Sequence, residues 1–93
     1  MKKLVTVTEP RTEIVEEDAY LMSLMGQRVT FWCMNYIWTG KLIGVNNVNV
    51  LLEDAHLVFE TGAFNTKDWK DAQKLPGEMA IQLSAVEAFG VVK

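Results

Sequence analysis

The sequence predicts a mainly β domain in which one N-terminal α-helix precedes five short, strongly bent strands. Two patterns lead to this prediction: apolar residues spaced i, i+4 and i+7 near the N-terminus, and alternating apolar and polar residues over most of the remaining chain. A third observation, glycines inside the strand patterns, indicates bends or bulges. With 93 residues, 49% of them apolar, the chain suits a single domain with one core over residues 1–93.

The N-terminal part is expected to form an arm and then a helix. Residues 1–12 alternate weakly and break at Pro10, so we interpret them as an N-terminal arm, with a short added strand as the alternative. Thr12 is a candidate N-cap, and the acidic residues after it carry the charge that a helix N-terminus favours. The apolar spacing then predicts a helix over roughly residues 13–25, with Gly26 as its natural end.

Five later segments show the period of two that is typical of strands. They cover residues 27–34, 37–45, 48–60, 79–83 and 86–91. Gly40 and Gly44 interrupt the second of these strands and predict a bend there, and the third is expected to kink near Ala55 and His56. Strands this short and bent predict a small barrel of the SH3 or OB kind.

A long connection, residues 61–77, separates the third strand from the fourth. Its length predicts a functional or a mobile loop. Asn65 or Thr66 is a candidate cap for one helical turn that would run through Trp69 to Ala72. We interpret Trp69 as a cover over one end of the barrel, with a secondary nucleic-acid contact as the alternative because three lysines flank it: Lys67, Lys70 and Lys74.

The chain has more large apolar side chains than one small barrel can enclose. Examples are Trp32, Met34, Trp38, Val50 and Leu52. Part of this apolar surface is therefore expected to be buried against another copy of the chain. Trp32 and Trp38 are expected either in the core or at such a subunit interface.

Composition and motifs exclude several functional classes. A net charge of −3 argues against a broad basic surface for duplex DNA, although it allows a small pocket that reads single-stranded bases. No apolar run approaches the roughly 18–20 residues of a membrane span. Cys33 is the single cysteine and is interpreted as a small core residue of a protein in a reducing, cytoplasmic compartment. His56 has no nearby cysteine or histidine, and no catalytic motif is found, so we expect no metal, no cofactor and no enzyme activity.

Two groups of residues carry a family resemblance. The first group is GQRV at 26–29, GKLIG at 40–44 and NVLLEDA at 49–55, and the second is IQLSAVEAF at 81–89. The first group is similar to the first motif of the Sm-like (LSm) proteins, which runs from G-x-x-V through G-x-L-x-G to an asparagine and an acidic end. The second group has the spacing of that family's second motif, I-R-G-x-x-V-x-x-I, without its arginine and glycine. The chain resembles this family over roughly residues 18–60 and 79–90.

The resemblance implies an SH3-like barrel that assembles into a homo-oligomeric ring, with the fourth strand of one subunit paired to the fifth strand of the next. It also implies single-stranded RNA as a partner at the inner rim of the ring. Asn49 corresponds to the asparagine that bonds a base edge, and Asn46 corresponds to the aspartate that braces the turn. Asn47 stands roughly where the family has its stacking aromatic, and Gln82 replaces the arginine.

Each of these predicted RNA-binding residues also has a structural interpretation. Hairpin geometry alone accounts for Asn46 and Asn47, since asparagine tolerates positive φ, and Asn49 or Gln82 is equally able to brace the chain. The alternative function is therefore a structural or protein-interaction ring without an RNA site. The divergence of the second motif also raises the hypothesis of a phage or mobile-element origin.

Overall fold

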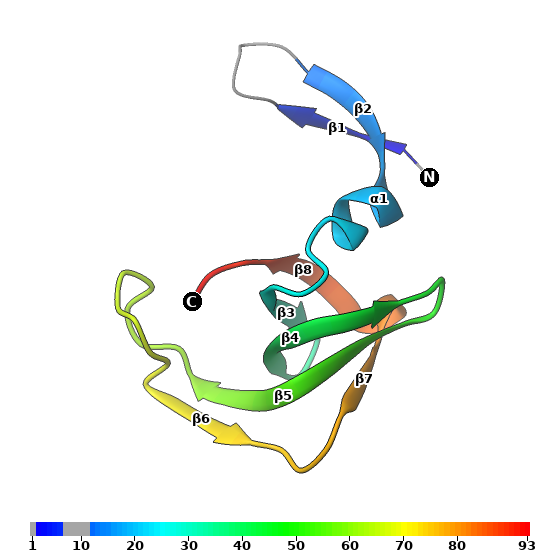
Figure 1. Cartoon of the computed structure of the whole chain (residues 1–93). Coiled ribbons are helices and arrows are strands. Elements are labelled where there is room, and N and C mark those ends of the chain that lie inside the picture. The colour runs from blue at the N-terminus through cyan, green and yellow to red at the C-terminus, as the bar shows by residue number, and fades with distance from the viewer. Residues whose placement is uncertain (1, 7–11) are drawn as a thin grey trace.

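The computed structural model describes the backbone of residues 2–6 and 12–93 and the side chains of residues 20–93. Its elements, in chain order, are β1 (Lys2–Thr6), β2 (Thr12–Glu16), α1 (Glu17–Met22), β3 (Arg28–Cys33), β4 (Ile37–Val45), β5 (Asn49–Glu60), β6 (Asp71–Lys74), β7 (Met79–Gln82), the 3₁₀ turn η1 (Leu83–Ala85) and β8 (Val86–Gly90). β1 and β2 form a two-stranded sheet (Figure 1). The other strands form an antiparallel sheet in the order β6-β5-β4-β3-β8, in which β7 also pairs with β5.

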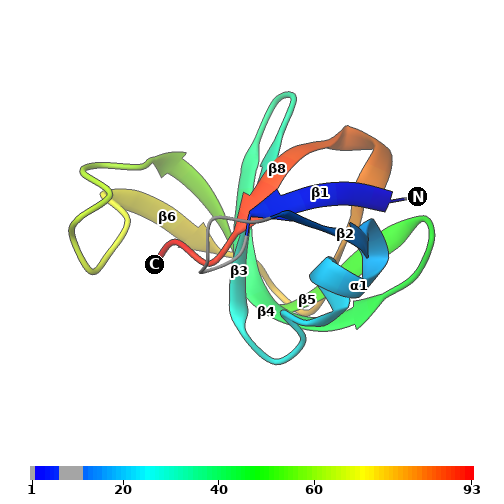
Figure 2. The ribbon, with the colours of Figure 1, turned by 90° about the horizontal axis from the view of Figure 1, so that it is seen from above.

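β5 organises the fold because its two halves pair with different strands. It has 12 residues and follows β4 along most of its length. Its first half, residues 49–52, pairs with β7, and its second half, residues 56–60, pairs with β6. The sheet curls around this strand, and η1 carries the chain from β7 to β8, which is paired with β3 (Figures 1 and 2). The two ends of β5 therefore lie in different surroundings.

The sheet bends where β4 contains glycine and where one residue of β5 has a left-handed backbone conformation. The register of the β4–β5 ladder shifts at Gly40, between Thr39 and Lys41, and again between Leu42 and Gly44. A Cβ atom on Gly40 would lie 3.0 Å from Leu52 Cβ, so glycine allows the two strands to approach closely here. On β5, Asp54 has φ of 50°. The predicted bend at the glycines is confirmed, and the predicted kink of the third strand lies one residue before Ala55.

One apolar core lies between the bent sheet and the segment that contains α1. Its buried members are Leu21, Leu24, Val29, Phe31, Leu42, Val50, Leu52, Ala55 and Ile81. Burial of a side chain as large as Phe31 or Leu42 contributes about 1.5–3 kcal/mol of hydrophobic stabilisation. Along β5, Val50 and Leu52 point into this core, so Asn49 and Leu51 point to the opposite face of the sheet.

The N-terminal prediction was wrong in its boundaries. Residues 2–6 form a strand, which agrees with the alternative of a short added strand, and they pair with a second strand over residues 12–16; the helix covers only residues 17–22. The β-branched residues of the segment TEIVE favour a strand over a helix, which explains the later start. Pro10 lies outside the described residues. Gly26 does end the segment that follows α1, with φ of 83°. Within residues 2–6 and 12–93, no helix is long and apolar enough to cross a membrane.

The prediction of a helical turn in residues 61–77 was also wrong. Neither Asn65 nor Thr66 begins a helix there, and residues 71–74 form β6 instead. One isolated helical turn is unstable because its nucleation fixes several dihedral angles for one hydrogen bond. Pairing with the second half of β5 gives residues 71–74 a ladder of four residue pairs instead. The tertiary contact therefore decides the local structure.

All five predicted strands of the domain are present, but they do not close into a barrel. In the described part of the chain, β7 pairs with β5 alone and β8 pairs with β3 alone. The short turn η1 separates β7 from β8 and lets them diverge. Among the described strands, the second edge of β7 and the second edge of β8 therefore take part in no strand ladder.

Candidate functional site

The turn between β4 and β5 is shaped by Asn46. Its Oδ1 accepts hydrogen bonds from the backbone N–H of Val48 at 2.8 Å and of Asn49 at 2.7 Å. The backbone N–H of Asn46 donates to Asn49 O at 3.0 Å, which closes the turn. The Asn46 carbonyl is therefore used inside the chain, whereas Asn47 is exposed at the tip of the turn.

The structure brings Asn49 and Gln82 together, although 32 other residues separate them in the sequence. They are direct partners in the β5–β7 ladder. The neighbouring Leu83 N–H donates to Val48 O at 2.8 Å, so Asn49 and Gln82 form a pair of the non-hydrogen-bonded kind. In such a pair the Cβ atoms lie about 4.5–5.5 Å apart and the side chains share one face. Two amides, each with donors and an acceptor, therefore stand side by side on the outer face of the sheet.

The two segments that carry this amide pair are uncharged. Residues 44–50 and 79–86 contain no lysine, arginine, aspartate or glutamate, and no aromatic residue. Val48, which is exposed, is the large apolar side chain at the tip of the turn. The pair can therefore offer hydrogen bonds to a ligand, but neither a ring for stacking nor a cation for phosphate.

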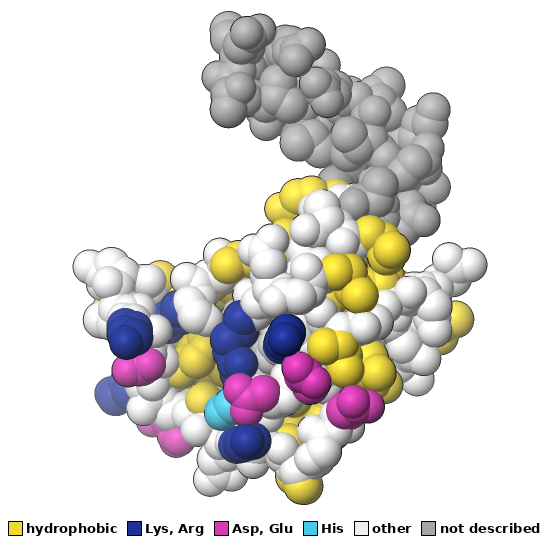
Figure 3. Space-filling model, viewed as in Figure 1, with side chains coloured by type: hydrophobic (Ala, Val, Ile, Leu, Met, Phe, Trp, Pro, Cys, Tyr) yellow, Lys and Arg dark blue, Asp and Glu magenta, His cyan; other side chains and the backbone are white. Residues whose placement is uncertain are grey.

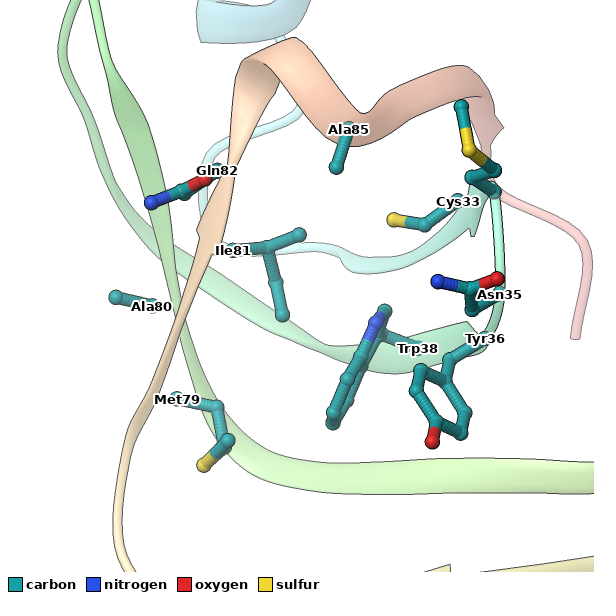
Figure 4. Close-up of a pocket in the computed structure, with 10 residues that line it drawn as sticks. Cys33, Asn35, Tyr36, Trp38, Met79, Ala80, Ile81, Gln82 and Ala85 are labelled. Atoms are coloured by element: carbon teal, nitrogen blue, oxygen red, sulfur yellow. The ribbon is translucent and has the colours of Figure 1, made fainter.

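A second feature lies beside the unpaired edge of β7. An open cavity of about 250 Å³ is bounded by the β3–β4 turn and by β7. Trp38, Ile81 and Met79 point toward it, whereas Ala80 and Gln82 point away (Figure 4). Tyr36 packs edge-on against Trp38, with ring centroids 5.9 Å apart. This apolar hollow therefore adjoins a strand edge that has free hydrogen-bonding groups.

These features were compared with known proteins. Neither the protein-family models nor the curated protein sequences give a match. Among solved structures, a heptameric archaeal Sm protein matches with a TM-score of 0.64 and 23% sequence identity, over 81% of this chain and 98% of that chain. This chain has the Sm-like fold. The family resemblance in the sequence motifs is thus confirmed at the level of the fold, which is what a likeness at this identity supports.

In this Sm-like fold, β7 and β8 are the strands that the resemblance assigns to contacts between subunits, and Asn49 and Gln82 are residues that it assigns to RNA. The structure places Asn46, Asn47, Asn49 and Gln82 along one neighbouring pair of segments, the β4–β5 turn and the end of β7. Their role toward RNA stays a prediction.

A charged cluster lies at the kink of β5. Arg28 Nη1 lies 3.0 Å from Asp54 Oδ2, and Lys74 Nζ lies 3.3 Å from Asp54 Oδ1. Hydrogen bonds from Lys74 and then from Arg28 hold the pKa of Asp54 below its ordinary value. Arg28 Nη2 also lies 2.9 Å from His56 Nδ1. The same ring nitrogen, His56 Nδ1, also lies 3.0 Å from Asp54 O. Figure 3 shows basic and acidic side chains interleaved around this histidine.

Cys33 is half-buried and packs against the core, as the sequence predicted. Burial, and then the charge of Glu87, raise the pKa of its thiol, which is the opposite of what a nucleophilic cysteine needs. Across the described residues, no group of three or more His, Cys, Asp and Glu side chains could hold a metal ion.

The three tryptophans occupy different environments. Trp38 packs against the core and lines the cavity beside β7, which fits both interpretations of this residue. Trp32 lies near Phe64, with ring centroids 6.5 Å apart. Trp69 also contacts Phe64, at 6.4 Å and with the rings nearly perpendicular, so it belongs to an aromatic cluster of the long connection. From the sequence we interpreted Trp69 as a cover over one end of the barrel, but Trp69 is not among the residues that pack against the core, and the sequence did not reveal this cluster.

Proposed function

We propose that the protein assembles into a homo-oligomeric ring in which β7 of one subunit pairs with β8 of the next. The observation that supports this proposal is that β7 and β8 each form a ladder with one strand only among the described residues. An exposed strand edge is a template for pairing, and a ring gives every edge a partner. The matched archaeal Sm protein is itself a heptamer.

The outer edge of β7 is suited to such a contact. Hydrogen bonds to β5 alternate along β7, and Leu83 bonds inward, so Ile81 and Met79 also bond inward. The backbone N–H and C=O groups of Ala80 and Gln82 therefore face outward. The apolar cavity with Trp38 adjoins the same edge, and a neighbouring subunit would cover it. The contact would thus combine a strand ladder with apolar burial.

Substitution of Ala80 by proline tests this assembly. Proline removes the outward N–H but leaves the inward bonds to β5, and an edge strand tolerates it. Ala80→Val is the matched control because it keeps the N–H on an exposed position. We expect light scattering coupled to size exclusion to give a multiple of the 10.5 kDa chain mass for the wild type and for Ala80→Val, and a smaller species for Ala80→Pro. A monodisperse wild-type monomer would contradict the proposal.

We further propose that the inner rim of this ring contacts single-stranded RNA through Asn49 and Gln82. Paired amides match the donor and acceptor pattern of base edges. Stacking is worth about 1–3 kcal/mol per base, and the rim segments have no ring to supply it. We therefore expect weak binding that depends little on salt, since residues 44–50 and 79–86 offer no cation to phosphate.

Fluorescence titration with U-rich and A-rich oligonucleotides at two salt concentrations tests this role. Asn49→Ala is expected to weaken binding more than Lys70→Ala, which removes a cation of the long connection. The reverse ranking would place the RNA contact on that connection. Absence of binding at low salt, with the ring intact, would favour the structural or protein-interaction ring instead.

A further inference from the structure

The ammonium group of Lys93 lies inside a loop at the end of β5 that is remote from the Asn49 turn (Figure 1). Lys93 Nζ donates toward four oxygen atoms of this loop: Ala63 O at 2.8 Å, Thr61 O at 2.9 Å, Asp68 O at 3.1 Å and Thr66 Oγ1 at 3.3 Å. Three of these acceptors are backbone carbonyls, and none is a carboxylate. The loop therefore surrounds the ammonium group with neutral dipoles.

Two aromatic rings complete the surroundings of this ammonium group. Lys93 Nζ lies 4.7 Å from the centroid of the Trp69 ring and 5.7 Å from that of the Phe64 ring. Both distances are within the range of cation–π attraction. Oxygen acceptors with two ring faces match an alkylammonium ion, which has N–H donors and an apolar stem. A hard metal ion would instead favour an all-oxygen site.

The loop also has internal hydrogen bonds to two of these oxygen atoms, Ala63 O and Thr61 O. Thr66 Oγ1 donates to Ala63 O at 2.7 Å, and Thr66 N–H donates to the same oxygen at 3.3 Å. Lys70 N–H donates to Thr61 O at 3.4 Å. Gly62 has φ of 67°, a conformation that glycine adopts at little cost. The arrangement is therefore a property of residues 61–70.

We propose that residues 61–69 form a binding cage for a primary ammonium group, and that Lys93 fills this cage from within the same chain. Lys93 then acts as a latch: loss of its charge, for example by acetylation, empties the cage. The latch adjoins an open cavity of about 540 Å³ that is lined by Trp69, Lys93 and basic side chains such as Arg28, Lys67 and Lys70. Release of Lys93 uncovers the Trp69 ring face toward that cavity.

Refilling of an emptied cage by a small ligand tests the proposal. The variant is Lys93→Ala, and the probe is methylammonium chloride, observed through the indole N–H signals of the three tryptophans in ¹⁵N-labelled protein. Trp69→Phe assigns the Trp69 signal, and Trp38, which lies outside the cluster, is the internal reference. We expect Lys93→Ala to shift the Trp69 signal, and methylammonium to return it toward the wild-type position with a saturable Kd of about 5 mM or weaker.

Matched salts and variants separate the ammonium group from simple charge effects. Tetramethylammonium chloride keeps the cation but has no N–H donor, and potassium and sodium chloride supply equal ionic strength. A return of the signal with these salts as well would overturn the assignment to a primary ammonium, and no saturable return with methylammonium would overturn the cage. Lys67→Ala removes a lysine side chain that is not among the groups contacting Lys93 Nζ, and it is expected to leave the Trp69 signal in place. Lys93→Gln, the acetylation mimic, is expected to behave as Lys93→Ala.

Discussion

The tight crossing of β4 and β5 gives a quantitative test of the fold. A Cβ atom added at Gly40 would lie 3.0 Å from Leu52 Cβ, 3.1 Å from Glu53 O and 3.2 Å from Ala55 Cα. Two of these three neighbours are backbone atoms, which cannot turn away as the end of a flexible side chain can. Gly40→Ala therefore forces the two strands apart at the bend.

The size of this effect follows from two opposing terms. Overpacking of a well-filled interior costs about 1–3 kcal/mol. Replacement of glycine by alanine also restricts the unfolded chain, which stabilises the protein by about 0.4–1 kcal/mol. We therefore expect Gly40→Ala to lower the free energy of unfolding by about 1–2 kcal/mol. Gly90→Ala is the control, since nothing lies within 4 Å of its added Cβ, and it should be neutral or slightly stabilising.

Urea unfolding, followed by tryptophan fluorescence at fixed protein concentration, measures both variants. The concentration is held constant because assembly would add a concentration-dependent term to the apparent stability. Gly44→Ala should fall between the other two variants, because its Cβ would lie 3.3 Å from Leu51 Cβ. Equal stability of Gly40→Ala and Gly90→Ala would refute the account of the bend.

Two further predictions concern the polar side chains at the ends of the bend. The folded-state pKa of Asp54 is below its unfolded value, so its stabilising contribution is complete above about pH 3.9 and is lost as the pH falls through the folded pKa. Asp54→Asn should therefore make the urea midpoint less dependent on pH between about pH 5 and pH 2, and an unchanged acid limb would contradict this. Asn46→Ala removes an acceptor of two backbone N–H groups and should lower the free energy of unfolding, measured with urea, by about 1 kcal/mol. Replacement of the exposed Asn47 by alanine should leave this free energy unchanged. Equal losses in the two variants would show that the Asn46 side chain does not hold the turn.

The central strands were predictable from the sequence because each alternates where one face is buried. Val29 and Phe31 of β3, and Val50 and Leu52 of β5, are fully buried, and the sequence marks them by spacing alone. The bend was predictable for a similar reason, since Gly40 interrupts an otherwise regular strand. In both cases the local sequence pattern and the tertiary packing favour the same structure.

The elements that were missed depend on partners that are distant in the sequence. β6 has the sequence DAQK, which has no strong strand preference, and it forms because β5 offers a free edge there. The open sheet, in place of a closed barrel, depends on the path of the chain through η1.

In the candidate site too, the sequence predicted individual residues, whereas their arrangement in space came only from the structure. Motif spacing pointed to Asn49 and Gln82 separately, but only the ladder register places them side by side. The cage around Lys93 consists mainly of backbone carbonyls. Because every residue has a carbonyl, no pattern of side chains in the sequence predicts the cage.

The neutral rim has a consequence for the proposed RNA contact. In nucleic-acid binding, phosphate contacts supply much of the affinity and its salt dependence, whereas contacts to base edges supply discrimination. A rim in which Gln82 and Asn49 stand without any charged neighbour retains the second kind of contact and lacks the first. Removal of one amide should therefore change which base is preferred more than it changes the salt dependence. An arginine introduced by Gln82→Arg should do the reverse, raising affinity for every sequence and steepening the dependence on salt.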